Sequence, residues 1–433
     1  MNKIQLEIIF DELYPINRSI LGEGYRKSLK ILQNHIPFKI IRFKSGEKVF
    51  DWNIPPEWII RDAYIESPEG NRIIDFKENN LHVIGYSTAI EKNLKLGELK
   101  KHLYTQKNLE NAIPYITSYY KKNWGFSIAY KHYKKLKSGN YNVLIDSEHK
   151  KGTLEVGEKV LKGRCKNEIL ISSYLCHPSM ANNELSGPLV MINLYNKIKA
   201  IKNRLFTYRF IVNPETIGSI AYISKKEKEL KKNVIGGIVL TCLGGPSKKL
   251  SYKLSKNSNS IIDRLFKRVN DIRIREFTPF GGSDERQYNS LGVNIKIGQI
   301  ARTVYEEYPE YHTSLDDKNF MNIDRIIESS TQIIRLIKDL ENESFYINLK
   351  PQCEPQLGKR NLYPNINSKL TREEKSNDSL TDGREFNRFS MILLNYSDGT
   401  YSLQELSIKF NVDMKTAINV AKVLEQNKLL KKL

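Results

Sequence analysis

The sequence predicts an α/β protein: a mixed sheet with helices on both faces, an inserted mostly β subdomain and a C-terminal winged helix. Three observations predict this arrangement. Apolar strands alternate with amphipathic helices across residues 159–350, as they do around a parallel-rich sheet. Short β-type runs separated by glycine, asparagine and proline occupy residues 62–158. Three short helical patterns close the chain after residue 386.

The first 45 residues are predicted to form one or two helices, because apolar residues recur there at near-helical spacing. The positions are Ile8, Leu13, Leu21, Leu29, Leu32 and Ile36. We expect these helices to pack on the α/β sheet. Residues 1–61 and 159–350 then form one domain, and the β subdomain at residues 62–158 is an insertion within it.

Strands and helices follow one another in the second part of this domain. The strand "EILISSYL" precedes a helix at about residues 186–199, and "YRFIVNP" precedes the helical run "TIGSIAYISKKEKELKK". The runs "VIGGIVLTCLG" and "GVNIKIGQI" add two strands. A long amphipathic helix is predicted over residues 323–340.

A polar segment, "KLTREEKSNDSLTDGREF", predicts a linker at residues 351–385, which leaves residues 386–433 as the winged helix. Ser402 with Glu405 forms a capping-box pattern, and Asp413 can cap the last helix. Residues 376–433 hold 8 Lys and Arg against 7 Asp and Glu, a net charge of only +1. Because duplex binding depends on phosphate neutralisation, DNA is not the favoured partner. A protein-contact or dimerisation module is favoured, which leaves a homo-oligomer open.

Composition narrows the class of protein. The net charge of +20 comes from lysines scattered among acidic residues and tyrosines, as on solvated faces. Four cysteines without a CxxC pair indicate reduced thiols and exclude a cysteine-ligated zinc. The chain shows neither a membrane-spanning run nor a signal-peptide core, so a cytoplasmic protein with no membrane partner is expected.

Four polar clusters lie at strand ends, where open α/β sheets bind ligands: "CHPSMANNELSG", "NPETIGS", "GGSDERQ" and "YPEYHTSLDD". They supply His177, Glu184, Glu215, Asp284, Glu285 and His312. Each residue alone has a plainer interpretation, as a capping or core histidine, a helix-terminal acid or a loop residue. Together, two histidines and several carboxylates are the ligand set of a hydrolytic zinc site.

These clusters also resemble those of a known family. "YHTSLDD", "GGSDE", "PETIGSIAY" and "ANNELSG" are similar to signatures of zinc aminopeptidases of the phosphorylase/hydrolase-like fold. The whole chain resembles a bacterial family of aminopeptidase-like proteins with an inserted small β domain and a C-terminal winged helix, often encoded beside polysaccharide-biosynthesis genes. "DWNIPPEWIIRDAYI", "NNLHVIGYS", "IPYITSYY", "CHPS" and "EYHTS" carry that resemblance over nearly the full length.

The resemblance implies that His177 and His312 are zinc ligands, and that Glu215 is either a ligand or the base that deprotonates the attacking water. The chain departs from the aminopeptidase pattern where carboxylates are expected. It has Ser179, Asn183 and Pro214 at such positions, and Thr241 with Cys242 at another. Neutral side chains are poor partners for two dications, so a dizinc centre is disfavoured.

The expected arrangement is therefore one Zn²⁺ held by His177, Glu184, His312 and Asp284, with Glu215 as the base. Asp284 could instead orient a ligand or the substrate from outside the metal's own shell.

The expected substrate is a peptide or another small amide-bearing compound, cleaved at an N-terminal peptide bond or deacylated at an amino sugar. A free amino group needs an anionic partner, for which Glu285, Asp316 and Asp317 are candidates; Arg286 and Arg302 could bind a carboxylate or phosphate. The inserted subdomain is expected to narrow the pocket or to make a dimer contact. The alternative functions are a catalytically reduced binding or regulatory protein linked to polysaccharide biosynthesis, and a winged-helix DNA-binding regulator.

Overall fold

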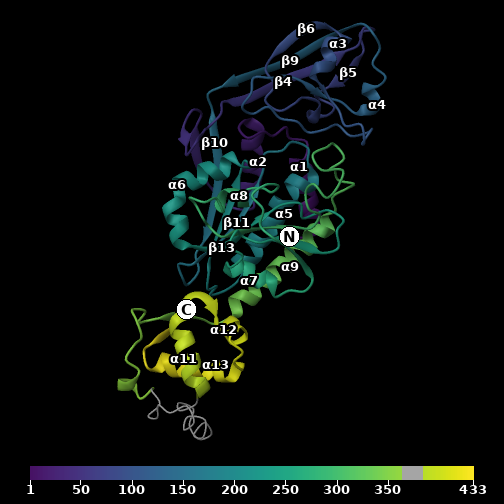
Figure 1. Cartoon of the computed structure of the whole chain (residues 1–433). Helices are drawn as coiled ribbons and strands as arrows, with labels where there is room; N and C mark the ends of the chain where they lie inside the picture. Colours follow the sequence, from purple (N-terminus) through teal and green to yellow (C-terminus); the bar gives the residue numbers. More distant parts are fainter. Residues whose placement is uncertain (363–383) are drawn as a thin grey trace. The chain divides into compact units, whose positions relative to one another are not determined.

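The computed structural model describes residues 1–362 and 384–433, which form two compact units (Figure 1). The first unit contains residues 1–161, 168–202 and 208–335. The second contains residues 162–167, 203–207 and 336–433. Most of the predicted linker at residues 351–385 lies outside the described residues.

The N-terminal segment forms two helices, as predicted, and a strand follows them. Helix α1 (Lys3–Leu13) begins after Asn2, whose side chain forms a capping box with Gln5. Helix α2 (Glu23–Gln33) follows, and strand β1 (Lys39–Lys44) joins the edge of the main sheet.

The main sheet has eight strands in the order β1-β10-β12-β11-β13-β16-β14-β15. Its other members are β10 (Thr153–Leu161), β11 (Glu168–Tyr174), β12 (Thr207–Asn213), β13 (Val234–Leu240), β14 (Leu250–Lys253), β15 (Ile272–Arg275) and β16 (Ile297–Ala301). β11, β13 and β16 run parallel, whereas β1, β10 and β12 form antiparallel pairs. Every residue of β11 and β12 is buried, so both faces of the sheet are covered.

Helices cover this sheet. α5 (Ser186–Lys199) packs on β11 and β13, α6 (Ile217–Asn233) on β10, and α7 (Ile261–Lys267) on β13 and β15. The short α8 (Glu285–Tyr288) lies against β16, and α9 spans Ile323–Asn342. The helix predicted at residues 186–199 is confirmed, and the one predicted at residues 323–340 ends two residues later.

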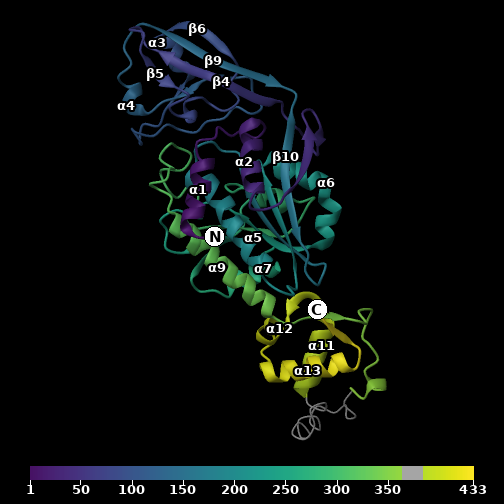
Figure 2. The same cartoon turned by 180° about the vertical axis from the view of Figure 1, so that it is seen from behind.

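The insertion forms a separate four-stranded antiparallel sheet in the order β5-β4-β9-β6, visible from both sides in Figures 1 and 2. Its strands are β4 (Glu57–Glu66), β5 (Arg72–Asp75), β6 (Ile90–Lys95) and β9 (Asn140–Lys150). The short strands β2 (Lys48–Val49) and β3 (Trp52–Asn53) form a hairpin just before it. Residue 62 falls inside β4 and residue 158 inside β10, so the small sheet begins earlier, and the main sheet resumes earlier, than the sequence predicts.

Smaller elements complete the insertion. They are the helices α3 (Leu96–Leu99) and α4 (Tyr130–Tyr133) and the parallel pair β7 (Leu103–Tyr104) and β8 (Phe126–Ser127).

The second unit contains the three predicted C-terminal helices, α11 (Arg384–Tyr396), α12 (Leu403–Lys409) and α13 (Met414–Gln426). The Ser402 capping box and the Asp413 cap are both present. Its sheet joins β17 (Phe345–Asn348) to β18 (Asp398–Ser402) and β19 (Leu430–Lys432). One strand thus comes from before the predicted linker.

The start of the predicted linker also belongs to this unit. Leu357 and Leu362 are buried in its core, beside apolar faces that the three short helices could not cover by themselves. Within the described part of the chain, no helix is long and apolar enough to cross a membrane.

Candidate metal centre

The predicted site residues follow strand ends of the main sheet. β11 ends three residues before His177, and β12 ends two residues before Glu215. The backbone of the surrounding loops is strained, because four non-glycine residues there adopt positive φ. They are Ser179, Thr216, Cys242 and His312, with φ between 46° and 63°. Strain of this kind persists only where the surrounding structure enforces it, and it clusters at functional sites.

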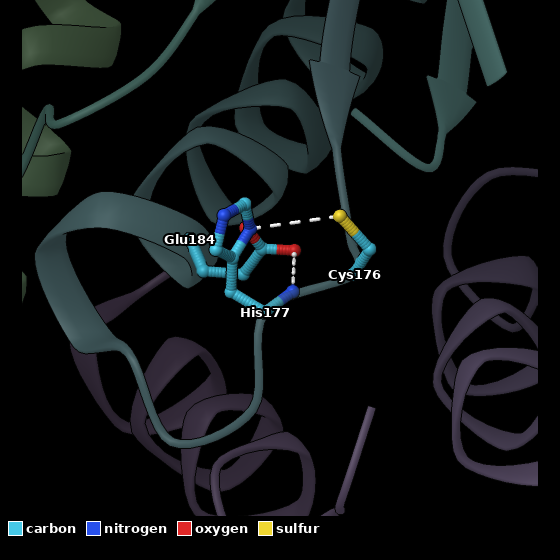
Figure 3. A group of neighbouring side chains, drawn as sticks. All are labelled: Cys176, His177 and Glu184. Carbon is cyan, nitrogen blue, oxygen red and sulfur yellow. Dashed lines mark hydrogen bonds and ion pairs between the residues drawn. The ribbon is translucent and has the colours of Figure 1, made fainter. Parts of the chain in front are cut away.

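Glu184 holds His177 from two sides. One carboxylate oxygen accepts a hydrogen bond from the His177 backbone N–H at 2.9 Å, and the other lies 2.6 Å from Nδ1. Glu184 comes from the single π-helical turn, Ala181–Leu185, that precedes α5. Figure 3 shows Glu184 and Cys176 both directed at His177. Since Nδ1 faces a carboxylate, Nε2 is the nitrogen left for a metal.

Cys176, His177 and Glu184 are the three metal-type side chains that the described residues bring closest together. The Cys176 sulfur lies 3.5 Å from His177 Nδ1 and accepts a hydrogen bond from the Glu215 N–H. Burial raises the pKa of Cys176 to about 11, so this side chain is a neutral thiol at pH 7. The thiol and the Glu184 carboxylate both contact His177 Nδ1, and a metal ion bound by this trio would have to displace the thiol proton.

On the other side of the His177 ring, away from Nδ1, the ring lies close to His312 and Glu215. The two imidazole centroids are 5.3 Å apart, and a Glu215 oxygen lies 3.6 Å from His177 Nε2. Burial and the neighbouring His177 lower the pKa of His312 to about 3, so its ring is neutral. Burial also raises the pKa of Glu215, although His177 opposes that shift. For His177, burial lowers the pKa, but Tyr115, Glu184 and Cys176 outweigh it and the net shift is upward.

Tyrosines from separate segments form the walls. Tyr115 packs against both imidazoles, with ring centroids 5.1 Å from His177 and 5.3 Å from His312. Tyr174 lies 5.6 Å from His177, and Tyr311 stacks on His312 at 3.9 Å. Three tyrosine rings thus contact the two imidazoles.

The inserted subdomain supplies one of these walls. The Tyr115 N–H donates to the His312 carbonyl at 2.8 Å, and Ser314 exchanges two hydrogen bonds with Ile113. The insertion is therefore joined directly to the loop that carries His312.

Asp284 lies behind this centre. One of its oxygens accepts hydrogen bonds from the Thr216 N–H and the Ser219 hydroxyl, and the other accepts from the Asn213 amide. Burial and the nearby Glu215 raise the pKa of Asp284 to about 7. Its visible role is to hold the strained turn beside Glu215.

The residues that depart from the aminopeptidase pattern make specific contacts in the structure. The Ser179 hydroxyl donates to Asn80 in the insertion at 2.7 Å. The Asn183 amide nitrogen faces Tyr174 and Cys242, while its buried Oδ1 has no hydrogen-bond partner among the described residues. Burial raises the pKa of Cys242 to about 11, so no carboxylate or thiolate replaces the missing acid there.

Other candidates lie apart from the imidazoles. Glu285 is buried in an ion pair with Lys253, at 3.0 Å. Asp316 accepts hydrogen bonds from the Asn182 and Asn183 N–H groups and so caps the π-helical turn. Arg302 donates to Ser329 and to two backbone carbonyls.

The sequence did not single out Tyr115, Cys176 or Arg18 as site residues. The Arg18 guanidinium is buried and donates to the His177 carbonyl at 3.0 Å. Its sequence context, "PINRS", is that of an ordinary loop arginine. Cys176 had a signal, since it adjoins His177 in the chain.

Residue types that suit a zinc ion lie beside His177. They are its own Nε2, the neutral His312 ring and the Glu215 carboxylate, and Asn183 Oδ1 is a buried oxygen without a hydrogen-bond partner among the described residues. In the described part of the chain, the three metal-type side chains whose ligand atoms all lie within 4.8 Å of one another are Cys176, His177 and Glu184.

Solved structures define the class to which this architecture belongs. A zinc aminopeptidase of Bacillus subtilis matches with a TM-score of 0.57 at 13% identity, covering 78% of this chain and 93% of that one. A Shewanella amazonensis peptidase M28 precursor matches with a TM-score of 0.52 at 13% identity, covering 77% and 91%. The first unit therefore has the zinc-aminopeptidase fold.

The chain belongs to the family described as DUF4910, a domain of unknown function, which matches residues 7–343; a winged helix-turn-helix family matches residues 344–432. A Clostridium acetobutylicum protein, described as an inferred polysaccharide biosynthesis protein with an aminopeptidase-like domain, is 40% identical over 98% of this chain and 95% of its own length. The crystal structure of an inferred peptidase from C. acetobutylicum matches with a TM-score of 0.78 at 38% identity, covering 100% and 96%.

Proposed function

We propose that this chain is a zinc-dependent hydrolase of the aminopeptidase type, with one metal ion bound by His177 and His312. The proposal rests on how Glu184 and Glu215 lie on either side of the His177 ring. Glu184 fixes the imidazole through Nδ1, and Nε2 then faces Glu215 at 3.6 Å beside a second, neutral imidazole.

In this proposal Glu184 and Asp284 act as positioning residues, because both oxygens of each carboxylate already accept hydrogen bonds. That assignment replaces the ligand roles expected from the sequence. Glu215 is the remaining acid, and its raised pKa suits a group that takes up and returns a proton.

A bound zinc ion would supply Lewis acidity and lower the pKa of a water molecule. Glu215 removes a proton from the attacking water and delivers it to the departing amine. The rings of Tyr115, Tyr174 and Tyr311 pack around the two imidazoles, and His177 and Glu184 are buried, which strengthens the charge interactions between them. The substrate is an N-terminal peptide bond or a related amide.

The test is metal content per chain, measured by elemental analysis on protein without a histidine tag. We expect about one zinc in the wild type and none in His177→Ala or His312→Ala. His149→Ala is the matched control, because that histidine lies in the insertion's β9 strand. Full zinc content in both site variants would refute the proposal.

A second candidate, a metal-poor binding or regulatory protein, is favoured by two observations. Ser179 points to Asn80 of the insertion, and Asn183 stands where a bridging acid is expected. An absence of bound zinc after dialysis against zinc would favour this candidate.

For the second unit, the net charge of only +1 over residues 376–433 favours a protein contact over DNA. A salt-dependent shift with random duplex DNA that disappears on deleting residues 386–433 would reverse that preference.

A further inference from the structure

Residues of the inserted subdomain and the β2–β3 hairpin line an open cavity with a volume of about 760 Å³. That volume is in the range of small-molecule sites. One tryptophan, three tyrosines and one histidine line it: Trp52, Tyr86, Tyr119, Tyr120 and His149. Trp52 and Tyr120 are 38% and 54% exposed, so solvent reaches two large rings that a core would have buried.

The ring geometry selects the kind of group that fits. Trp52 and Tyr120 meet edge to face, with centroids 5.3 Å apart and planes at 72°. A nucleobase sandwiched between two rings needs parallel planes roughly 7 Å apart, twice the usual contact distance. The Trp52 and Tyr120 pair instead presents one electron-rich ring face, which attracts the C–H groups of a saturated ring.

The polar side chains of this cavity are suited to binding a ring that carries hydroxyl groups and a negative charge. Asp51, Asn53 and Ser118 line the cavity and can exchange hydrogen bonds with hydroxyl groups. Lys121 and Lys122 also line it, and neither forms an ion pair within the described part of the chain. Two ammonium groups against the single carboxylate of Asp51 leave an excess of positive charge.

This cavity adjoins the candidate metal centre. The Tyr119 hydroxyl lies 2.9 Å from the Tyr115 hydroxyl, and the Tyr115 ring packs on His177 and His312. A single tyrosine therefore separates the cavity wall from the two imidazoles.

We propose that this cavity binds an anionic saccharide, a sugar ring that carries a carboxylate or phosphate, as the glycosyl part of the amide cleaved at the metal centre. The second half of this statement rests on the proposed function. The binding half does not, because Trp52, Tyr120, Lys121 and Lys122 lie outside the catalytic group.

The experiment is isothermal titration calorimetry on the full chain with a glucuronic-acid-terminated disaccharide. Its neutral glucose counterpart, glucose 1-phosphate and a diglutamate peptide are titrated in parallel. We expect the acidic disaccharide to bind and the neutral one to bind roughly 10-fold more weakly. Binding of glucose 1-phosphate as well identifies the anionic charge, rather than the carboxylate itself, as the recognised group.

Two variants locate the site. Trp52→Ala and the double variant Lys121→Ala/Lys122→Ala should each weaken binding roughly 10-fold. Phe50→Ala, an exposed aromatic residue of the same segment that does not line this cavity, and Lys100→Ala/Lys101→Ala, another exposed lysine pair, are the matched controls. The proposal is overturned if the disaccharide fails to bind, if the site variants bind it as the controls do, or if diglutamate binds equally well.

A hydrolysis assay separates the two proposals. Saccharide binding without zinc-dependent cleavage of any peptide or sugar-linked amide would refute the proposed function and leave the binding site standing. Zinc-dependent cleavage of peptide amides, together with no saccharide binding, would keep the function and refute this site.

Discussion

Glu184 binds His177 through both carboxylate oxygens, one on the backbone N–H and one on Nδ1. The pair fixes the ring orientation and reserves Nε2 for the side of the site that holds Glu215 and His312. This relationship suggests a positioning role for Glu184, and its removal should therefore weaken the site without abolishing it.

Glu184→Gln should lower zinc affinity about 10–100-fold, the usual effect of losing an outer hydrogen-bond partner of a ligand histidine. A chelator-competition titration measures it. Glu227→Gln on α6 is the control and should leave the affinity unchanged. A complete loss of zinc, equal to that of His177→Ala, would instead identify Glu184 as a ligand.

Glu215→Gln distinguishes the two roles left open for that residue. If Glu215 is the base, the Glu215→Gln variant should still bind zinc but lose about 10²–10⁴-fold in turnover. Metal analysis and a steady-state assay on the same preparation give the answer. If zinc disappears together with turnover, Glu215 is a ligand and the water must lose its proton elsewhere.

Asn183→Asp should raise zinc affinity by roughly 10-fold or more, because it places a negative charge where a buried oxygen has no hydrogen-bond partner in the described part of the chain. The same substitution should destabilise the zinc-free protein, since the new carboxylate is buried. Asn182→Asp is the neighbouring control, because the Asn182 side chain already accepts a hydrogen bond from Gly244. Equal zinc affinities for the wild type and Asn183→Asp would show that this position does not face the metal.

Asp284 should make the zinc-free protein less stable as the pH rises. Its pKa is about 7 when folded, against about 3.9 in an unfolded chain, so the folded state keeps a proton between these values. Stability then falls through the window from pH 4 to pH 7, by up to about 1.4 kcal/mol per pH unit.

Asp284→Asn should remove the contribution of Asp284 to the pH dependence of the unfolding free energy. This expectation holds even if the substitution also changes the absolute stability. Urea unfolding at a series of pH values measures the slope. Asp271→Asn is the control, because Asp271 is exposed. An unchanged slope in Asp284→Asn would mean that Asp284 does not retain its proton in this window.

Much of the architecture was predictable from local pattern. The helix at residues 186–199 and the caps at Ser402 and Asp413 depend on periodicity and on side chains a few residues apart. The boundaries of the insertion were less predictable, because β4 and β9 are continuous strands whose sheet partners are distant in sequence. The same limit applies to β17, which pairs across the predicted linker with β18 and β19.

The sequence by itself determined which residue types could form a site, since His177, Glu215 and His312 follow elements whose ends meet at one edge of a sheet. Only the tertiary structure decided their partners. It paired Glu184 with Nδ1 of His177, placed Asp284 behind Glu215, and brought Tyr115 from the insertion onto both imidazoles. The physical reason is that hydrogen bonds and ring contacts depend on distance in space, whereas sequence patterns report only neighbours along the chain.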